Sequence, residues 1–339
     1  MRTAIFAFSR RGCAAAGRIR DALGGECRCY TMEKYCTEGF APIVPPLADF
    51  TGPVFAWADA LVFVGACGIA VRAIAPHLRD KRTDPAAVVV DELEKFVISL
   101  LSGHIGGAND LADRLAAALG AVPVVTTATD VNGRFAVDAW AAKQGLHIGS
   151  REAAKAVSAA VLEGSVPLCT DFPVVGELPA GVEMGKTGDV GICISWKNQS
   201  PFRETLLLAP PVLHLGIGCR RGISEEAVAS LVEQVLDEAG ALPEAVKMVA
   251  SIDLKQDEPG LLEFCRRRKW PVSFYSAKEL SDVEGEFTPS KFVQETTGVD
   301  NICERAALLG AERLLVKKVA KDGVTAAIAV ESWEVYFDG

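Results

Sequence analysis

One sequence pattern restricts the fold of this chain more than any other. It is a short apolar run followed by a glycine-rich turn and then by an amphipathic stretch. The clearest copy is FVISLLSGHIGGANDLADRLAAALG, residues 96–120. Its first part has the continuous apolar character of a buried strand, and its second part has the spacing of a helix that ends at Gly120. Residues 3–23, residues 60–78 and the segment after residue 212 repeat this order. Strands that alternate with helices predict α/β domains with largely parallel sheets.

Two regions with this pattern are separated by a segment of a different kind. We expect an N-terminal α/β domain in residues 1–135 and a C-terminal α/β domain in residues 212–339. Residues 136–200 combine two helical stretches with short strand-like pieces broken by prolines and glycines, which favours a smaller α+β segment. Residues 201–211 are polar and contain proline, so we predict a linker there.

Composition and charge exclude several classes of protein. Half of the residues are hydrophobic and 23% are charged, as in globular proteins rather than disordered ones. A net charge of -9 disfavours nucleic-acid binding, so any anionic ligand needs local basic groups. The longest uncharged run near the start, residues 60–71, is shorter than the roughly 20 residues that cross a bilayer. The N-terminus lacks the pattern of a secretory signal, so we expect a cytoplasmic protein that does not bind membranes.

The ten cysteines raise the question of a metal site. Cys13, Cys27, Cys29 and Cys36 lie near one another in the sequence, but the chain has no paired C-x-x-C spacing. We therefore predict no metal site, and expect small, reduced and mostly buried thiols.

The joint between the strand and the helix of residues 96–120 is a candidate binding site. A glycine-rich turn exposes backbone N–H groups, and a hydroxyl, an imidazole and an amide lie beside them. An ordinary tight turn with a local Ser102 hydrogen bond and a surface His104 explains the sequence equally well. The residues of the candidate site are Ser102, Gly103, His104, Gly106, Gly107 and Asn109.

Similar turns follow other predicted strands. Open α/β sheets bind ligands beyond the carboxyl ends of their strands, and paired arginines suit carboxylates. Solvated arginines and helix capping by Asp257 are the alternatives. The candidate residues in these turns are Gly65, Gly68 and Arg72 in the first domain, and Gly216, Gly218, Cys219, Arg220, Arg221, Asp253 and Lys255 in the second.

AGVEMGKT, residues 180–187, has the composition of a relaxed phosphate-binding loop, with Lys186 and Thr187 where phosphate and magnesium would bind. Such a loop must lead from a strand into a helix. The following GDVGICISW has the pattern of a strand instead, which disfavours nucleotide binding.

Five stretches are distinctive when they are taken together: GIAVRAIAPHLRDKRTDPAAVVVDE, SLLSGHIGGAN, LGIGCRRG, SIDLKQDEPG and SKFVQETTGVDNICERAALL. In this order they resemble the cobalt-precorrin-5A hydrolase family (CbiG) of anaerobic cobalamin biosynthesis. The likeness extends from about residue 50 to about residue 330, and SLLSGHIGGAN and SIDLKQDEPG are its most specific parts. The first 45 residues and the middle segment carry little of it.

The resemblance implies a hydrolase that opens the δ-lactone of cobalt-precorrin-5A and releases acetaldehyde, giving cobalt-precorrin-5B. Water is the cosubstrate, and the only metal implied is the cobalt carried by the substrate. The implied partner is this cobalt corrinoid. A homodimer and transient contacts with neighbouring pathway enzymes are both compatible with the resemblance.

This chemistry needs an activated water and a group that stabilises the developing oxyanion. We expect His104 to transfer protons, because imidazole titrates near neutral pH, and Ser102 with the turn amides to bind the oxyanion. The absence of G-x-S-x-G disfavours Ser102 as a nucleophile. Arg72, Arg220, Arg221 and Lys255 would then form a basic rim for substrate carboxylates, with the ligand between the two α/β domains.

Two alternatives from other functional classes are open on the sequence alone. A corrinoid carrier would bind the lactone and return it intact. An enzyme that uses a nucleotide at residues 180–187 would lose ATP binding when Lys186 is replaced by alanine.

Overall fold

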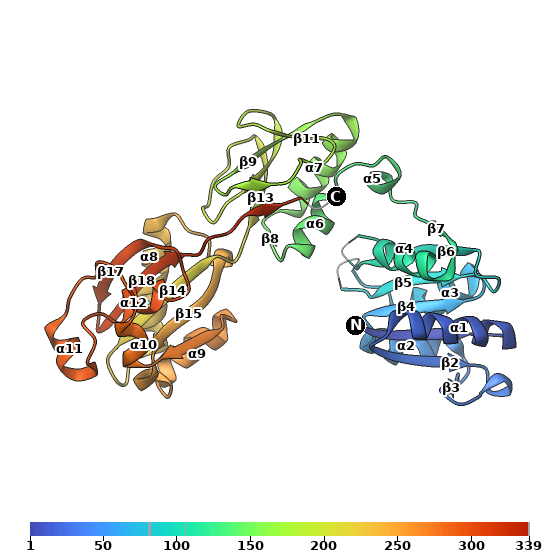
Figure 1. The fold of residues 1–339 in the computed structure, drawn as a ribbon, viewed down its shortest axis with the longest axis horizontal. Helices are drawn as coiled ribbons and strands as arrows, with labels where there is room; N and C mark the ends of the chain where they lie inside the picture. The colour runs from blue at the N-terminus through green and yellow to red at the C-terminus, as the bar shows by residue number, and fades with distance from the viewer. Residues whose placement is uncertain (81–82, 105, 338–339) are drawn as a thin grey trace. The chain divides into compact units, whose positions relative to one another are not determined.

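The computed structural model describes residues 1–80, 83–104 and 106–337. The chain divides into two compact units, Met1–Lys143 and Gln144–Gly339 (Figure 1). The first unit therefore includes helix α6 (Val137–Lys143), which the sequence assigns to the middle segment.

The first unit is built on a seven-stranded sheet with the order β3-β2-β1-β4-β5-β6-β7. Strands β1 to β5 are parallel to one another, β5 and β6 form an antiparallel hairpin, and β7 is parallel to β6. The strands are β1 (Arg2–Ala7), β2 (Glu26–Thr31), β3 (Phe40–Pro42), β4 (Ala60–Val64), β5 (Ala86–Val90), β6 (Phe96–Leu101) and β7 (Val122–Val124).

Helices cover both faces of this sheet. Helices α1 and α4 pack on one face through residues such as Ile19 and Leu115, and α2 and α3 pack on the other through residues such as Phe55 and Ile74. Alternate residues of β1, β4 and β5 contribute to the two cores, which explains why these strands read as continuous apolar runs. The helices of the unit are α1 (Arg10–Leu23), α2 (Leu47–Trp57), α3 (Cys67–Ile74), α4 (Ala108–Leu119), α5 (Ala128–Val131) and α6, with 3-10 turns η1 (Glu33–Tyr35) and η2 (Ala75–His77).

Helix α4 ends where the sequence pattern predicts, and a glycine also caps its start. Gly120 closes the helix in the left-handed conformation at φ 67°, as predicted. At the start, Gly107 is the cap residue at φ 80° and makes no side-chain capping bond. The strand after this helix, β7, ends at Val124, and polar residues follow it.

The second unit begins with the middle segment, whose five-stranded sheet has the order β11-β9-β12-β13-β8. Strands β11, β9, β12 and β13 are parallel, so the segment is an α/β layer rather than an α+β insert. The predicted linker at residues 201–211 is wrong, because it contains β13, which pairs with β12. The elements are β8 (His147–Ile148), α7 (Arg151–Glu163), β9 (Val166–Thr170), β11 (Val182–Met184), β12 (Val190–Ile194) and β13 (Glu204–Ala209), with β10 (Val174–Val175) paired to β19 (Val335–Tyr336).

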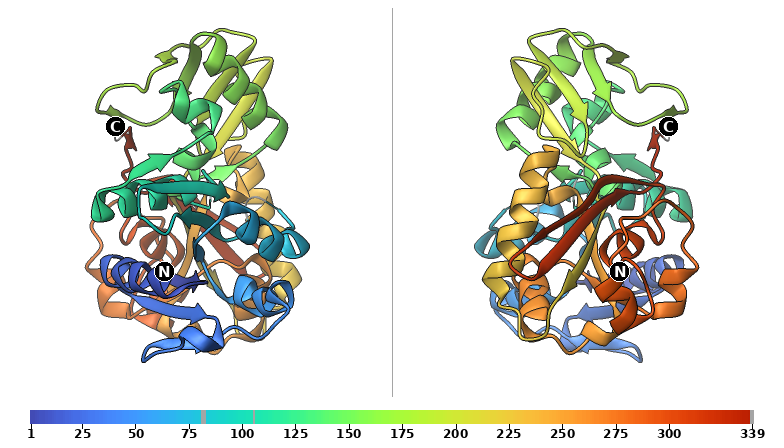
Figure 2. Two further views of the ribbon diagram at one scale, coloured as in Figure 1. Left: turned by 90° about the vertical axis from the view of Figure 1, so that its right-hand side faces the viewer. Right: turned by 90° about the vertical axis from the view of Figure 1, so that its left-hand side faces the viewer.

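The rest of the second unit contains a five-stranded sheet with the order β16-β15-β14-β18-β17. β14, β15 and β16 are parallel, whereas β18 runs antiparallel to both β14 and β17. The long β17 and β18 lie side by side in the right-hand view of Figure 2. The strands are β14 (Leu213–Cys219), β15 (Val246–Ile252), β16 (Val272–Tyr275), β17 (Arg313–Lys321) and β18 (Val324–Val330).

Helices cover this sheet on both faces as well. α8 and α9 contribute to the larger core and α12 to the opposite one. Ser224 caps α8 by accepting from Ala227 N–H, whereas α9 is preceded by Glu258 rather than capped by Asp257. The helices are α8 (Glu225–Ala239), α9 (Pro259–Arg268), α10 (Ala277–Ser281), α11 (Lys291–Thr297) and α12 (Cys303–Leu308), with 3-10 turns η3 (Pro243–Ala245) and η4 (Asp253–Lys255).

All ten cysteines are free thiols, and Cys36 is exposed rather than buried. Burial raises the pKa of Cys29 to about 11 and that of Cys193 to about 12, so both stay protonated near neutral pH. Among the described residues, no helix combines the length and the apolar character needed to span a membrane.

Candidate functional site

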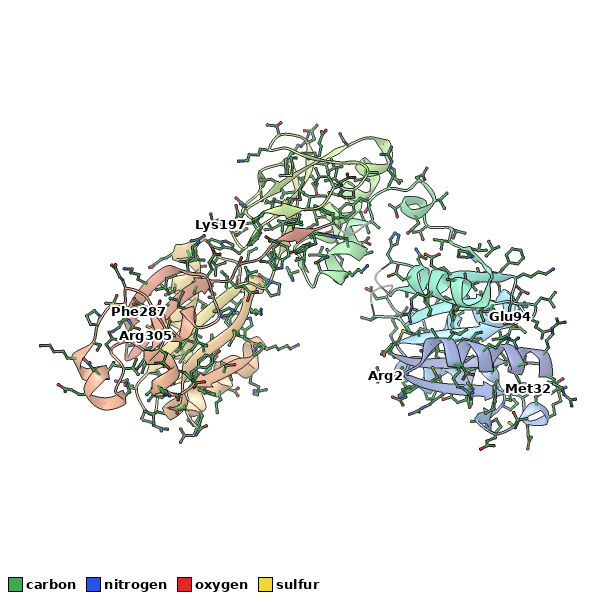
Figure 3. The ribbon with its side chains drawn as sticks, viewed as in Figure 1. Arg2, Met32, Glu94, Lys197, Phe287 and Arg305 are labelled. Atoms are coloured by element: carbon green, nitrogen blue, oxygen red, sulfur yellow. The ribbon has the colours of Figure 1, made fainter. Side chains whose placement is uncertain are left out.

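The direction of β6 decides where the glycine-rich joint lies. Because β6 is antiparallel to β5, the joint that follows Leu101 lies beside the amino ends of β1, β4 and β5. This end of the strands is called an edge of the sheet. Arg2 at the start of β1 and Glu94 in the β5–β6 turn mark the two edges in Figure 3, where they lie at opposite ends of the sheet.

Gly65, Gly68 and Arg72 follow the carboxyl end of β4 and so lie at the opposite edge from the joint. Gly65 N–H donates to the Val90 carbonyl at 2.8 Å, beside the end of β5. The Arg72 guanidinium turns back to donate to Gly68 O at 3.0 Å. The prediction that these residues share one site with the joint is therefore wrong. The hairpin between β5 and β6 reverses the chain before the joint is reached.

The glycines of the joint allow the chain to form a tight loop. Ser102 has φ 57°, and a Cβ on Gly106 would lie 2.3 Å from Ser102 Cβ. The loop also uses its own amides, because Gly107 N–H donates to His104 O at 2.9 Å and Ala108 N–H donates to Ser102 O at 3.1 Å. These two N–H groups are therefore not free for an oxyanion. Ile105 lies outside the described residues.

Ser102 and Asn109 have structural contacts rather than the predicted catalytic and substrate-binding ones. The Ser102 hydroxyl is buried and donates to Asp84 O at 3.0 Å, which ties the joint to the loop before β5. Asn109 accepts from Ser99 Oγ at 2.6 Å through its amide oxygen. A Cβ on Gly103 would lie 2.7 Å from that oxygen, so Gly103 allows Asn109 to approach.

His104 is the residue of the joint that is placed for proton transfer. Its Nε2 lies 2.6 Å from Asp130 Oδ2 and 3.1 Å from Thr129 Oγ1, and its Nδ1 lies 3.6 Å from Asp138 Oδ1. Asn109 Nδ2 also donates to Asp130 Oδ2 at 3.1 Å, which fixes the carboxylate. Asp130 holds Nε2 by a hydrogen bond, whereas Asp138 lies beyond hydrogen-bond distance of Nδ1, so Nδ1 is the nitrogen that can exchange a proton.

Asp130, Thr129 and Asp138 are site residues that the sequence analysis missed. Asp130 and Thr129 belong to the polar run TTATD after β7. Because β7 is parallel to β6, that run ends at the same edge of the sheet as the joint. A polar cluster directly after a strand is the signal that could have identified them.

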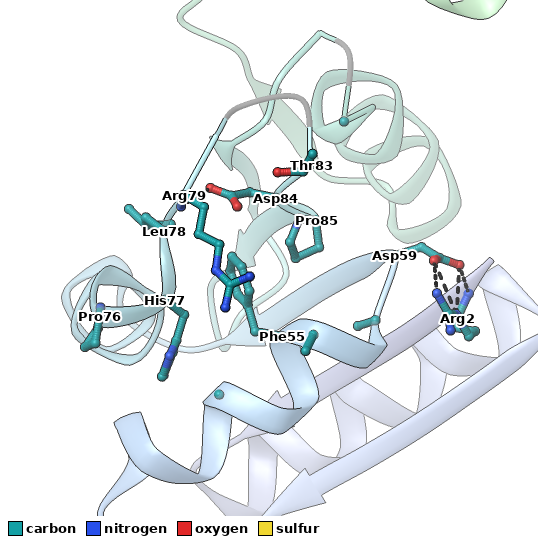
Figure 4. Close-up of a pocket in the computed structure, with 14 residues that line it drawn as sticks. Arg2, Phe55, Asp59, Pro76, His77, Leu78, Arg79, Thr83, Asp84 and Pro85 are labelled. Atoms are coloured by element: carbon teal, nitrogen blue, oxygen red, sulfur yellow. Dashed lines mark hydrogen bonds and ion pairs between the residues drawn. The ribbon is translucent and has the colours of Figure 1, made fainter. Parts of the chain in front are cut away.

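A cavity of about 840 Å³ opens at this same edge (Figure 4). Gly106 of the joint and Asp84, whose carbonyl accepts from Ser102, both line it. At its far side Arg2 pairs with Asp59 at 2.7 Å, and this hydrogen bond lowers the pKa of the Asp59 carboxyl. The other lining residues are Gly52, Phe55, Ala56, Ala58, Pro76, His77, Leu78, Arg79, Thr83 and Pro85.

A second cavity, of about 490 Å³, lies at the carboxyl end of β14. It contains three of the predicted residues, Gly218, Cys219 and Arg220, together with Lys318 and Lys321. Burial raises the pKa of Cys219 to about 11, so this thiol is neutral near pH 7. The cavity thus presents three cationic side chains and one carboxylate, that of Asp322.

Comparison with known proteins matches both ends of the chain to one family. The model described as "Cobalamin synthesis G N-terminal" matches residues 49–130, and "Cobalamin synthesis G C-terminus" matches residues 213–329. The chain is 37% identical to the cobalt-precorrin-5A hydrolase of Salmonella typhimurium, over 96% of this chain and 97% of that protein. It belongs to the CbiG family. It is also 34% identical to the cobalt-precorrin-5A hydrolase of Priestia megaterium, over 80% of this chain and 78% of that one.

A solved structure from Sulfolobus solfataricus, a putative cobalamin biosynthesis protein G homolog, also resembles this CbiG chain. The identity is 22%, the coverage is 98% of this chain and 97% of that one, and the TM-score is 0.42. The N-terminal family model begins in α2 and ends at Asp130, so it includes the joint and the carboxylate that holds His104.

The other predicted binding residues of the second domain do not line the cavity at β14. Arg221 donates to Asp257 Oδ1 at 2.5 Å and to Leu254 O at 2.7 Å, and the pair lowers the pKa of Asp257. Asp253 and Lys255 lie in η4, after β15, and neither lines the cavity at β14.

Gly216 is a packing residue, not a binding residue. It is buried in β14, and a Cβ there would lie 1.8 Å from the Cys303 carbonyl of α12. Its predicted role in substrate binding is therefore wrong, since the backbone of a helix occupies the space beside it.

The segment at residues 180–187 does not form a phosphate-binding loop. It contains β11, and the next element is β12, so no helix opens at Lys186 and Thr187. The backbone geometry that a phosphate requires is absent from this described segment.

Proposed function

We propose that this CbiG chain is a cobalt-precorrin-5A hydrolase, acting in the cytoplasm. The observation that supports this most strongly is the 37% identity to the Salmonella typhimurium hydrolase, which extends over nearly the whole of both proteins. The reaction opens the δ-lactone of cobalt-precorrin-5A and releases acetaldehyde, giving cobalt-precorrin-5B. Cobalt is part of the substrate, and water is the other reactant.

In the proposed mechanism, His104 moves the protons. Its Nε2–H donates to Asp130, which leaves Nδ1 to take a proton from water as the water oxygen bonds to the lactone carbonyl carbon. The carbon–oxygen bond of the ring then breaks, and the departing oxygen takes up the proton. The products of this step are a free alcohol and a carboxylic acid, which releases its proton to solvent and becomes a carboxylate.

Acetaldehyde leaves in a second step. The alcohol loses its proton, its carbon–oxygen bond becomes a carbonyl, and the carbon–carbon bond to the macrocycle breaks. The electron pair of that bond stays on the macrocycle, which takes up a proton. Since both steps need one group that accepts and returns protons, a single imidazole held by Asp130 and Thr129 can serve them in turn.

Incubation with the cobalt lactone tests the proposed function. We expect acetaldehyde, measured by a coupled dehydrogenase assay, to appear in a one-to-one ratio with a corrinoid whose mass has changed by the added water and the lost aldehyde. Recovery of unchanged lactone, bound but intact, would instead identify a carrier.

The cavity at β14, whose three cationic side chains outnumber its one carboxylate, is proposed to contact carboxylates of the substrate. Replacing Arg220 and Arg221 together with alanine should raise KM about tenfold or more, because hydrogen bonds to charged groups contribute that much, while kcat changes less. The single variants separate the two residues. Arg220→Ala should carry the effect, since Arg221 is held by Asp257. An unchanged KM in the double variant removes this cavity from the proposal.

A further inference from the structure

Two side chains of the 840 Å³ cavity, Arg79 and His77, have no role in the mechanism above and were not among the predicted site residues. Arg79 is exposed, and its backbone N–H donates to Asp84 Oδ2 at 2.9 Å. Within the described part of the chain, its guanidinium forms no hydrogen bond or ion pair. Figure 4 shows this side chain extending from its loop toward Phe55.

His77 is held with one nitrogen toward the protein. Its Nε2 lies 2.7 Å from Ala48 O, and because a carbonyl only accepts, Nε2 carries the hydrogen. The ring packs against Gly52, where a Cβ would lie 2.9 Å from His77 Cε1. Among the described residues, the buried side-chain polar atoms that lack a hydrogen-bond partner are Thr3 Oγ1 and His214 Nδ1. His77 Nδ1 also forms no hydrogen bond to a described residue, but it is not one of these buried atoms, so a ligand can reach it.

The anionic groups around the cavity already have donors. Asp59 is paired with Arg2, and Asp84 is almost fully buried and accepts from the Arg79 amide. The titratable group of α2, which packs against His77, is the exposed Asp49. Arg79 is therefore the cation of this cavity whose charge is not neutralised by a described partner.

The same cavity has an apolar wall. Phe55, Pro76, Leu78 and Pro85 line it alongside the charged groups. Its volume lies in the upper part of the range of about 300–1,000 Å³ found for ligand sites. An apolar wall beside an unpaired guanidinium suits a large, mostly apolar ring that has carboxylates on its periphery.

We infer that this cavity binds a carboxylated macrocycle, with Arg79 donating paired N–H groups to one peripheral carboxylate and protonated His77 donating from Nδ1 as a second contact. The identity of the macrocycle rests on the proposed function, whereas carboxylate recognition does not. Lysine at position 79 would keep the charge and lose the planar fork of donors.

Binding of cobyrinic acid, a cobalt corrin with free side-chain carboxylates and no lactone, tests the inference without turnover. Titration of the full-length protein should give a Kd that rises at least about tenfold in Arg79→Ala and less in Arg79→Lys. Cobinamide, whose side chains are amides, should bind weakly to all three proteins. Arg114→Ala, which changes an exposed arginine of α4 outside the cavity, should bind cobyrinic acid like the wild type.

The contribution of His77 is measured by pH. Imidazole changes charge between pH 5 and 8, while carboxylates stay ionised. Affinity for cobyrinic acid should therefore fall from pH 5.5 to pH 8 in the wild type, and this slope should be lost in His77→Gln, whose amide can still donate to Ala48 O.

Equal Kd values in the wild type and Arg79→Ala, or equal binding of cobyrinic acid and cobinamide, would overturn the inference. A pH slope that persists in His77→Gln would remove His77 from it. These results are independent of acetaldehyde release. If the enzyme is active but its Kd for cobyrinic acid does not depend on Arg79, the inference is refuted and the proposed function is not. Arg79-dependent binding without acetaldehyde refutes the proposed function alone.

Discussion

Alanine in place of His104 is expected to lower kcat for acetaldehyde release by about 10²- to 10⁴-fold, the usual contribution of a general acid or base. The variant removes the imidazole that Asp130 and Thr129 hold and leaves the rest of the loop unchanged. His104 is largely shielded but lies outside the core clusters, so folding should be retained. Single-turnover measurement of acetaldehyde, with circular dichroism as the folding control, checks this.

Asp130→Asn is the matched variant for that experiment. It keeps the shape of the side chain and an oxygen that accepts from His104, but it removes the negative charge beside the imidazole. We expect a smaller loss of kcat than in His104→Ala, and no further loss when the two changes are combined, since both act on one unit. Full activity in His104→Ala would exclude this imidazole from the mechanism.

Gly216→Ala is expected to destabilise the second unit by about 3 kcal/mol or more, the upper range for overpacking a core. Its Cβ would meet the Cys303 carbonyl at 1.8 Å and the Ala307 nitrogen at 2.6 Å, and both are backbone atoms of α12. Neither can move without shifting the helix against β14. Denaturant unfolding, followed by tryptophan fluorescence, to which Trp270 beside the core of this sheet contributes, measures the change.

Gly17→Ala is the control for that experiment. Gly17 lies inside α1, and nothing occupies the space within 4 Å of where its Cβ would be. The same chemical change should therefore stabilise the protein by up to about 1 kcal/mol through helix propensity. If Gly216→Ala unfolds at the wild-type denaturant concentration, the close approach of α12 to β14 is not present in solution.

The elements of the two α/β layers could be predicted from sequence because their signals are local. Continuous apolar runs mark β4 and β5, which helices cover on both faces. Ser224 marks the start of a helix through its side-chain hydroxyl, and Gly120 marks the end of one through its backbone N–H. Residues 91–95 form the turn of the antiparallel hairpin between β5 and β6. Its consequence, that the joint lies at the edge opposite Arg72, follows only when the reversal of β6 is carried through to the whole sheet.

The partners of the candidate site were harder to predict because they are distant in the sequence. Asp130 reaches His104 across 26 residues, and Gly216 approaches a helix that begins at Cys303. A glycine after an apolar run has the same appearance whether it makes room for a ligand or for a backbone. Only the packed structure distinguishes Gly216, which contacts α12, from Gly218, which lines a cavity.

The central claim is that water cleaves the internal ester of the corrinoid at the edge of the sheet that carries His104. Reaction of the lactone in ¹⁸O-labelled water, followed by mass spectrometry of the corrinoid product, tests it most directly. We expect one labelled oxygen in the newly formed carboxylate with the wild-type protein, and unreacted lactone with His104→Ala. An unlabelled product, or equal labelling by the two proteins, would contradict it.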